Sequence, residues 1–265
     1  MIRALTVGMD TKTIVITGAS GGIGAATAHR LGRDGHNLVL AARREAALAT
    51  VAEGIAGDVL TVPTDVTRRA DVERLRDRAL ERFGAVDVWI NNAGRGLSVP
   101  VLELTDADID DMITTNVKSA LYGMQVIVPH FKERGRGHLI NVSSFLARAP
   151  LAPVRSAYSA AKAALNSLTS NLRMELAQPY PQIHVSTVMP GMVQTDFATN
   201  AMGDGGVPVP PPAAASAAMG IQTADDVAEV IAALIERPRA EVYTNPTSPE
   251  TARRWFDSLR AFEPL

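Results

Sequence analysis

Two side chains near the middle of the chain are of types that can move a proton. Tyr158 and Lys162 lie four residues apart, so a helix would place them on one face. A free phenol has a pKa of about 10, and a fixed ammonium group beside it in a partly dry site lowers that pKa. The pair follows Ser144, which comes just after a predicted strand at residues 138–142. Tyr-x-x-x-Lys alone occurs by chance on many surface helices, so its meaning depends on the rest of the chain.

A glycine-rich turn near the N-terminus gives a second signal. The apolar, β-branched residues 14–17 are followed by Gly18, Gly22 and Gly24, and a helical pattern then begins. Such a turn brings backbone N–H groups, at the positive end of a helix dipole, close to a phosphate that a Cβ atom would exclude. The turn predicts a bound nucleotide, and an ordinary strand-to-helix connection is the alternative. The spacing differs from the common G-x-G-x-x-G fingerprint and reads T-G-x-x-x-G-x-G.

Together these motifs resemble the classical short-chain dehydrogenases/reductases over about residues 12–196. The matching segments are the glycine turn, the sequence N-N-A-G at 91–94, the serine, tyrosine and lysine, and P-G-x-V-x-T at 190–195. One departure is that Ser144 precedes Tyr158 by fourteen residues, where family members more commonly have thirteen. Ser143 is therefore the alternative to Ser144, which is preferred because the second serine of such a pair is the usual one.

The resemblance implies a role for each matching residue. Tyr158 would exchange the proton, Ser144 would hold the substrate oxygen, and Lys162 would bind the nicotinamide ribose. Asn116, in a kinked helix, would pass protons through water to Lys162. The implied catalytic set is Asn116, Ser144, Tyr158 and Lys162, and the implied cofactor contacts are Gly18, Ser20, Gly22, Ile23, Gly24, Arg43, Asp65, Val66, Asn92, Ala93, Gly94, Tyr158, Lys162, Pro190, Gly191, Val193 and Thr195.

Several of these residues also have ordinary structural explanations. Asp65 suits the N-cap of a helix starting near residue 69, and Asn92 suits a hydrogen-bonded turn. Asn116 interrupts a helical pattern, where asparagine usually points to solvent or bonds to the backbone. Pro190 and Gly191 form a common turn sequence after a strand.

The cofactor preference depends on the end of the second strand, at residues 37–41. Ala42 stands where the NAD-preferring members of the family carry aspartate, and Arg43 follows it. An arginine at this place accommodates a 2′-phosphate, so NADP(H) is predicted over NAD(H). The alternative is that Arg43 and Arg44 start a solvated helix. The family's other NADP device, a basic residue before the second glycine, is missing because Gly21 stands there.

The elements that must position these residues alternate between strand and helix from residue 14 to 190. This pattern predicts an α/β fold, a doubly wound parallel sheet of Rossmann type in a single domain over 1–265, with ligand at the carboxyl ends of the strands. We expect a long helix over residues 105–134, bent at Pro129. Residues 197–222 are expected to form a mobile substrate loop, and 223–265 a helix-strand-helix extension. The last helix carries an apolar stripe that predicts core packing, through Trp255, Phe256, Leu259 and Phe262.

Composition narrows the partners. The 265 residues include 26 Lys and Arg against 28 Asp and Glu, which does not favour nucleic acid or an anionic membrane. The chain has no cysteine, and its five histidines lack metal-type spacing, so no metal is expected. No leader or membrane span is evident, and a cytoplasmic protein is expected. The resemblance implies a homodimer or homotetramer formed through the long helices.

The favoured hypothesis is an NADP(H)-dependent reductase of ketones or aldehydes, acting on CH–OH groups in the reverse direction. An apolar loop at 197–222 favours a neutral, fairly hydrophobic substrate. The alternatives are an NAD-linked alcohol dehydrogenase, a nucleotide-sensing protein without chemistry, and a sugar-nucleotide epimerase or dehydratase. The intact Ser144, Tyr158 and Lys162 argue against the sensor, and the glycine spacing and the short C-terminal part argue against the epimerase.

Overall fold

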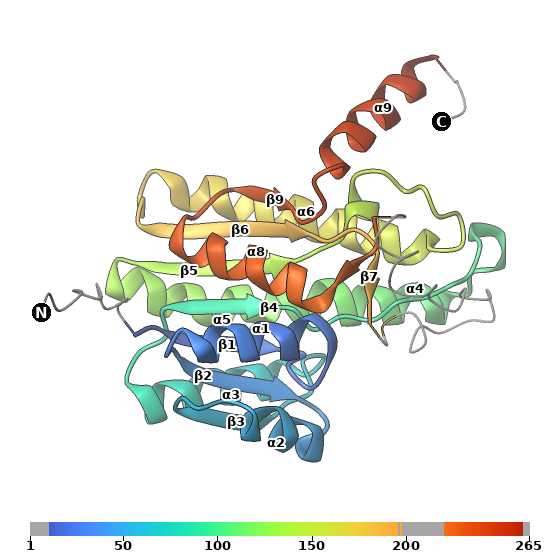
Figure 1. The fold of residues 1–265 in the computed structure, drawn as a ribbon. Helices are drawn as coiled ribbons and strands as arrows, with labels where there is room; N and C mark the ends of the chain where they lie inside the picture. Colours follow the sequence, from blue (N-terminus) through green and yellow to red (C-terminus); the bar gives the residue numbers. More distant parts are fainter. Residues whose placement is uncertain (1–10, 196, 198–219, 262–265) are drawn as a thin grey trace, which may run out of the picture.

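A computed structural model describes residues 11–195, 197 and 220–261. Its centre is a seven-stranded sheet in the order β3-β2-β1-β4-β5-β6-β9, and every neighbouring pair is parallel (Figure 1). The chain winds outward from β1 to β3 and then returns to place β4 on the other side of β1. This reversal marks the point, at the carboxyl ends of β1 and β4, where doubly wound folds form the crevice that binds their ligands. The predicted fold class is confirmed.

The bounds of the elements agree with the predicted pattern to within a few residues. The strands of the main sheet are β1 Thr13–Thr17, β2 Asn37–Ala42, β3 Val59–Pro63, β4 Val88–Asn91, β5 Gly137–Val142, β6 Ile183–Met189 and β9 Glu241–Tyr243. The helices are α1 Gly22–Arg33, α2 Glu45–Glu53, α3 Arg69–Phe83, α4 Asp106–Ile113, α5 Ser119–Arg134, α6 Ser156–Ala177, α8 Ala224–Glu236 and α9 Ser248–Ala261. Short 3₁₀ turns lie at Val101–Glu103 and Phe145–Ala147.

Alternate residues of the strands supply two separate apolar layers. Ile14 and Ile16 of β1 pack on the side of α1, α2 and α8, whereas Val15 packs on the side of α3, α5 and α6. The neighbouring strands keep this alternation in register, because Val15 is paired with Val39 on one side and with Trp89 on the other. Covering both faces in this way buries the sheet and leaves its carboxyl edge for the polar groups that follow the strands.

The predicted long helix is interrupted around Asn116, where the resemblance implies a kink, and not at Pro129. A π-helical turn at Thr114–Lys118 separates α4 from α5, and α5 continues through Pro129. The Asn116 side chain explains the interruption, because its amide donates to the carbonyl oxygen of Met112, four residues earlier, at 3.3 Å. A backbone N–H normally occupies that acceptor, and π-turns of this kind are frequent at functional sites.

Two small strands, β7 Val193–Gln194 and β8 Gln222–Thr223, pair with each other beyond the main sheet. The backbone N–H of Gln222 also donates to the carbonyl of Met192 at 2.9 Å. The segment that connects them contains the predicted substrate loop, most of which lies outside the described residues.

The last helix departs from the predicted core packing. Helix α9 leads away from the sheet (Figure 1), and only its beginning is buried, at Ala252. Phe256 is 48% exposed and Trp255 is half-buried. The side chains of Leu259 and Phe262 lie outside the described residues. The described side chains of this apolar stripe are therefore not packed in the core. In the described part of the chain, no helix combines the length and apolar character that crossing a membrane requires.

Candidate active site

The glycine turn joins β1 to α1 and packs against the segment that follows β4. Gly18 has a φ of 67°, and a Cβ atom there would lie 2.8 Å from Cα of Ala93. A Cβ atom on Gly24 would lie 2.6 Å from Nδ2 of Asn92 and would also collide with the carbonyl oxygen of Gly18. Both positions therefore require glycine, and the N-N-A-G segment explains why.

Thr17 is the hydrogen-bonding centre of this contact. Its hydroxyl accepts from the backbone N–H groups of Asn92 and Ala93 at 3.0 and 3.1 Å and donates to the carbonyl of Ile90. The Asn92 side chain returns a hydrogen bond to the carbonyl of Thr17 at 2.9 Å. The amides thus brace the two strands at the crevice. Sequence reasoning placed Thr17 in the motif but assigned it no contact.

The start of α1 fits a bound phosphate. Its N-cap, Gly21, makes no side-chain capping bond, and the first turn holds no acidic residue. The first N–H groups of a helix have no partner within the helix, so this end presents donors together with the positive end of the dipole. Ser20 and Ile23 flank it, and Gly22 adopts a φ of 51°. The Cβ and Cγ2 atoms of Thr195 lie 3.5 Å from where a Cβ of Gly22 would be, so Thr195 borders the same turn.

The two arginines after β2 differ in what they contact. The Arg44 guanidinium contacts Ser20, with Nη2 at 3.3 Å from its hydroxyl, and lies 3.8 Å from a Cβ built on Gly21. Arg43 is exposed at the end of the strand. Arg44 is exposed and is the N-cap of α2, as expected for a solvated helix start, and its guanidinium also reaches the glycine turn at Ser20.

Asp65 and Val66 follow β3 on the same edge. One carboxylate oxygen of Asp65 accepts from both the backbone N–H and the hydroxyl of Thr67, at 3.0 and 2.7 Å. This is an Asx turn, and the N-cap of α3 is Arg68 instead, so the capping explanation for Asp65 was wrong. Val66 packs against the apolar layer on the side of α3 and α5.

Tyr158 and Lys162 project from the first turns of α6 and are both buried, with 7% and 3% of their surface exposed. The Lys162 ammonium donates to the carbonyl of Val142, the last residue of β5, at 2.9 Å and lies 5.9 Å from the centre of the Tyr158 ring. A Cβ on Gly94 would lie 3.3 Å from Nζ of Lys162 and 2.9 Å from Oδ1 of Asn116. The end of the N-N-A-G segment therefore passes directly beside the lysine.

The two serines after β5 point in different directions. Ser144 hydrogen-bonds the hydroxyl of Tyr158 and accepts from the backbone N–H of Leu146 at 3.2 Å. Ser143 donates instead to the carbonyl of Lys162, at 3.3 Å. Ser144, and not Ser143, therefore lies at the phenol, and its role as the catalytic serine stays a prediction.

Asn116 is held by the backbone of Arg95. Its Nδ2 donates to the carbonyl of Arg95 at 3.0 Å, and its Oδ1 accepts from the N–H of the same residue at 3.1 Å. This bidentate pair fixes the π-helical turn against the loop after β4 and places Asn116 next to Gly94 and Lys162. The residue is 1% exposed, so the solvent-facing explanation does not apply.

Burial dominates the protonation of the central pair. It raises the pKa of Tyr158 to about 12, although the hydrogen bond from Ser144 and the charge of Arg155 act to lower that pKa. Burial also lowers the pKa of Lys162 to about 8. The sequence predicted a tyrosine pKa lowered toward neutrality by Lys162. In this structure the cost of taking a phenolate out of water is larger.

The remaining predicted contacts follow β6. Pro190 is buried, and its carbonyl accepts from the N–H of Phe145 at 2.8 Å. Val193 packs against the apolar layer of α1 and α8, and Gly191 faces Asn245. Phe197, which sequence reasoning did not single out, lies with its ring 5.5 Å from that of Tyr158. No pattern in the sequence signals this contact.

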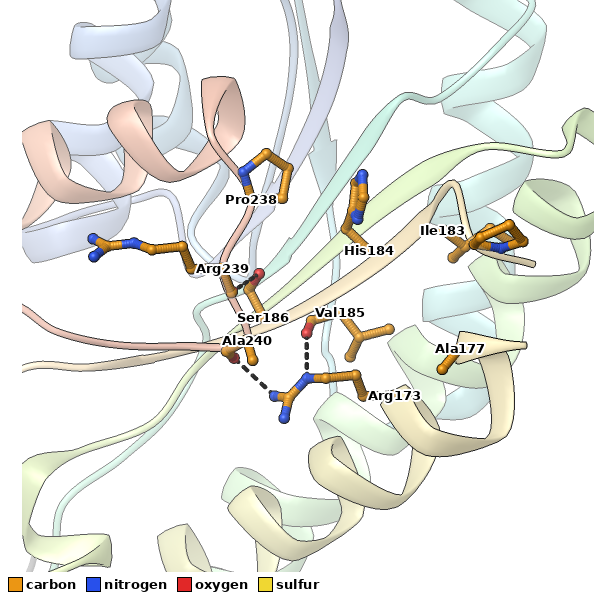
Figure 2. A pocket seen from close by; sticks show the side chains of 10 residues that line it. Arg173, Ala177, Ile183, His184, Val185, Ser186, Pro238, Arg239 and Ala240 are labelled. Carbon is orange, nitrogen blue, oxygen red and sulfur yellow. Dashed lines mark hydrogen bonds between the residues drawn. The ribbon is translucent and has the colours of Figure 1, made fainter. Parts of the chain in front are cut away.

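A pocket of about 250 Å³ lies at the amino ends of β6 and β9, which is the end of the strands away from the candidate active site (Figure 2). Arg173, His184 and Arg239 are among its lining residues. Arg173 bonds the carbonyls of Val185 and Ala240, both at 2.8 Å (Figure 2). None of the predicted site residues lines this pocket. Within the described ranges, no group of three or more His, Cys, Asp or Glu residues could hold a metal ion.

Comparisons with known proteins agree with this geometry. A model of the short chain dehydrogenase family matches residues 12–204. An uncharacterized oxidoreductase of Staphylococcus aureus strain N315 is 40% identical over 188 residues, which cover 71% of this chain and 80% of that protein. Two solved structures are each 29% identical. A Burkholderia phymatum short chain dehydrogenase/reductase in complex with NAD covers 97% of both chains with a TM-score of 0.85. An alcohol dehydrogenase from the archaeon Thermococcus sibiricus, complexed with 5-hydroxy-NADP, covers 88% of this chain and 96% of its own with a TM-score of 0.76.

The family model alone spans well over half of the chain, and its match ends just beyond the segment that borders the glycine turn. The chain therefore belongs to the short-chain dehydrogenases/reductases, a family of NAD(P)-dependent oxidoreductases.

Proposed function

We propose that this protein is an NADP(H)-dependent reductase of ketones or aldehydes and, in reverse, a dehydrogenase of the corresponding alcohols. The observation that carries the proposal is that Ser144, Tyr158 and Lys162 lie together beside the N-N-A-G segment, which packs on the glycine turn. The overall reaction is carbonyl plus NADPH plus a proton, giving alcohol plus NADP⁺. A small-molecule substrate is the partner that this chemistry requires.

Tyr158 would supply the proton to the carbonyl oxygen. With a pKa of about 12 its phenol keeps the proton at neutral pH, which suits a general acid in reduction. In oxidation the same group must first lose that proton, so oxidation should gain from higher pH. Ser144 already bonds the phenol and can hold the substrate oxygen near it. When bound, NADP(H) supplies or accepts the hydride.

Lys162 and Asn116 would keep this arrangement in place. The lysine spans from α6 to the last carbonyl of β5, and it can reach the nicotinamide ribose from there. Asn116 holds the loop after β4 through the backbone of Arg95. The backbone beside it can hold a water on a path to Lys162, which is the relay that the family resemblance implies.

The preference for NADP(H) rests on the end of β2. Arg43 and Arg44 follow Ala42, and Arg44 together with Ser20 lies against the glycine turn. Two guanidinium groups favour a 2′-phosphate, whereas the carboxylate that would accept both ribose hydroxyls is missing. The related structures include complexes with 5-hydroxy-NADP and with NAD, so the family accommodates both. The cytoplasmic location and the homodimer or homotetramer stay predictions from the sequence.

The test is a fluorescence titration with NADPH and NADH, followed by the loss of NADPH absorbance with a panel of ketones and aldehydes. We expect tighter binding of NADPH and turnover of at least one carbonyl compound. Arg44→Ala should weaken NADPH binding about 10- to 100-fold, the value of one or two charge-assisted hydrogen bonds, and change NADH binding little. Arg43→Ala is the paired variant that shows how the two arginines share the phosphate.

Each alternative gives a different result. Equal losses for NADPH and NADH in both variants would contradict the NADP(H) assignment and favour an NAD-linked dehydrogenase. Tight binding without turnover of any carbonyl compound would favour a nucleotide sensor.

A further inference from the structure

Arg155 is a half-buried arginine with few partners. It is the residue directly before α6, and its Nη1 donates to the carbonyl of Leu97 at 3.5 Å, the outer limit of a hydrogen bond. Among the described residues it forms no ion pair. Arg148 and Arg134, which are also partly buried, each contact a carboxylate, that of Glu241 and of Asp87.

Its position points toward the candidate active site. Arg155 precedes Tyr158 by three residues and is the N-cap of α6, so both residues lie at the start of this helix. Leu97, whose carbonyl it contacts, packs in the same apolar cluster as Tyr158. The hydroxyl of Ser156 donates to the carbonyl of Val99 at 2.7 Å and fixes the start of α6 to this loop. The Arg155 guanidinium therefore contacts the loop that packs against Tyr158.

Arg155 and Tyr158 are close enough to act on each other's pKa, because the guanidinium favours the ionised form of the phenol. Burial lowers the pKa of Arg155, and its interaction with Tyr158 acts to raise that pKa again. A guanidinium withdrawn from water without a partner costs free energy. The same partial withdrawal strengthens its attraction for any anion that arrives, and its planar fork matches a carboxylate through two parallel hydrogen bonds.

We propose that Arg155 binds a carboxylate of the carbonyl substrate, so that the enzyme prefers keto acids to neutral ketones. The inference rests on the proposed reductase function and names its substrate class. It replaces the neutral, hydrophobic substrate expected from the composition of residues 197–222, most of which the structure does not describe. The carboxylate takes no part in hydride or proton transfer. It positions the carbonyl group relative to Tyr158.

The experiment compares acids with their uncharged analogues. We would measure kcat/KM with NADPH for 4-oxopentanoate and 5-oxohexanoate, each beside its methyl ester, in the unmodified enzyme and in Arg155→Leu. The unmodified enzyme should prefer an acid. Arg155→Leu should lower kcat/KM for that acid about 10- to 100-fold, mainly through KM, and change the ester less than about threefold. Arg155→Lys should restore part of the preference, because it keeps the charge.

Arg148→Leu is the matched control. Arg148 also lies in the segment between β5 and α6, but its guanidinium already pairs with the carboxylate of Glu241. It should leave the ratio of acid to ester unchanged. Two results would overturn the inference. One is an unmodified enzyme that prefers the esters or shows no preference. The other is an equal fall for acid and ester in Arg155→Leu with a shifted pH profile, which would show that Arg155 acts on Tyr158 alone.

A second measurement separates this inference from the proposed function. Calorimetric titration of the two acids into the protein with NADP⁺ reports binding without turnover. If no ketone is reduced, the proposed function fails, and the titration still decides the role of Arg155. Binding of an acid that is lost in Arg155→Leu supports the carboxylate site, and absence of binding to the unmodified protein contradicts it.

Discussion

Helix α6 begins near the carboxyl ends of the strands and finishes near their amino ends. A half-buried arginine lies close to each of these two points. Near the C-terminal end of α6, Arg173 donates to the carbonyls of Val185 and Ala240 at 2.8 Å and to the hydroxyl of Thr187 at 3.5 Å. It thereby ties β6 to β9, the edge strand. Before the start, Arg155 has one long hydrogen bond to Leu97. Burial lowers the pKa of both, so their surroundings differ in partners more than in solvent.

This difference distinguishes polar side chains that stabilise the fold from polar side chains that are available to bind a ligand. The pocket beside Arg173 has a measurable volume, yet its guanidinium is engaged by the backbone of the strands (Figure 2). The carboxyl edge carries the uncapped start of α1 and Arg155, two sets of donors that the described part of the protein satisfies incompletely. A concave surface is therefore a weaker sign of chemistry here than polar groups that lack partners.

The strongest test of the comparison is Tyr158→Phe at the carboxyl edge. The variant keeps the ring that packs against Phe197 and removes the proton donor. We expect kcat for carbonyl reduction to fall about 10²- to 10⁴-fold, the usual contribution of a general acid. NADPH binding, measured by fluorescence, should change little.

Tyr243→Phe is the control for that prediction. Tyr243 ends β9 at the same edge, burial also raises its pKa, and its ring lies 6.2 Å from that of Phe145. It should keep nearly full activity. A fall of less than tenfold in Tyr158→Phe, or an equal fall in both variants, would remove Tyr158 from the proton-transfer role.

The second test is Arg173→Leu at the amino edge. The substitution leaves the carbonyls of Val185 and Ala240 without their donor, so the free energy of unfolding should fall by about 1–3 kcal/mol. Urea unfolding measures this loss, and kcat/KM at 25 °C should stay the same. Arg239→Leu is the control. Arg239 lines the same pocket but is exposed, and its side chain points away from Arg173 (Figure 2), so a change within about 0.5 kcal/mol is expected.

Loss of activity in Arg173→Leu without loss of stability would break the comparison, because the amino edge would then take part in function. The structure gives the opposite expectation, since Arg173 is bonded to the backbone at both strands.

Local patterns in the sequence predicted most of the elements correctly. Helix α3 spans the predicted residues because Gly84, with a φ of 75°, ends it in the left-handed conformation that glycine favours. The nearly continuous apolar runs of β1 and β2 likewise indicate burial on both faces. The resemblance predicted the kink at Asn116, whereas propensity alone pointed to Pro129. A π-helical turn depends on which acceptor a side chain occupies, and periodicity does not encode that choice.

The errors at the site concern long side chains and distant contacts. Arg44 is exposed at the start of α2 as expected, but its guanidinium also turns back to Ser20, a contact that no local pattern signals. Arg155 meets Leu97, which is 58 residues away, so no local pattern signals the contact. The pKa of Tyr158 depends on how deeply the completed fold buries the phenol, and a spacing of four residues to Lys162 cannot give that depth. Such features arise from tertiary packing of flexible groups.

The last and smallest expected effect concerns His138, which lies at the amino edge on β5. The hydroxyl of Ser186 donates to the carbonyl of Arg239 at 2.6 Å, so Nε2 of His138 must be the donor in its 2.8 Å hydrogen bond with that hydroxyl. Nδ1 is then a buried acceptor without a partner in the described structure. Burial, and to a smaller extent His184, lowers the pKa of His138 to about 3.

The unfolded chain binds this proton near pH 6.5, well above the pKa in the folded protein, so stability is complete above pH 6.5 and falls as the pH approaches 3. The slope from this group is at most about 1.4 kcal/mol per pH unit. His138→Gln keeps a donor for Ser186 and removes the titration, so its urea midpoint should fall less between pH 6.5 and 4 than that of the unmodified protein. His184→Gln leaves His138 in place and should retain the acid sensitivity. Identical pH dependence in the unmodified protein and His138→Gln would show that other groups govern acid unfolding. The expected result would show that a histidine at the amino ends of the strands makes stability depend on pH, separately from the pH dependence of catalysis at the carboxyl ends.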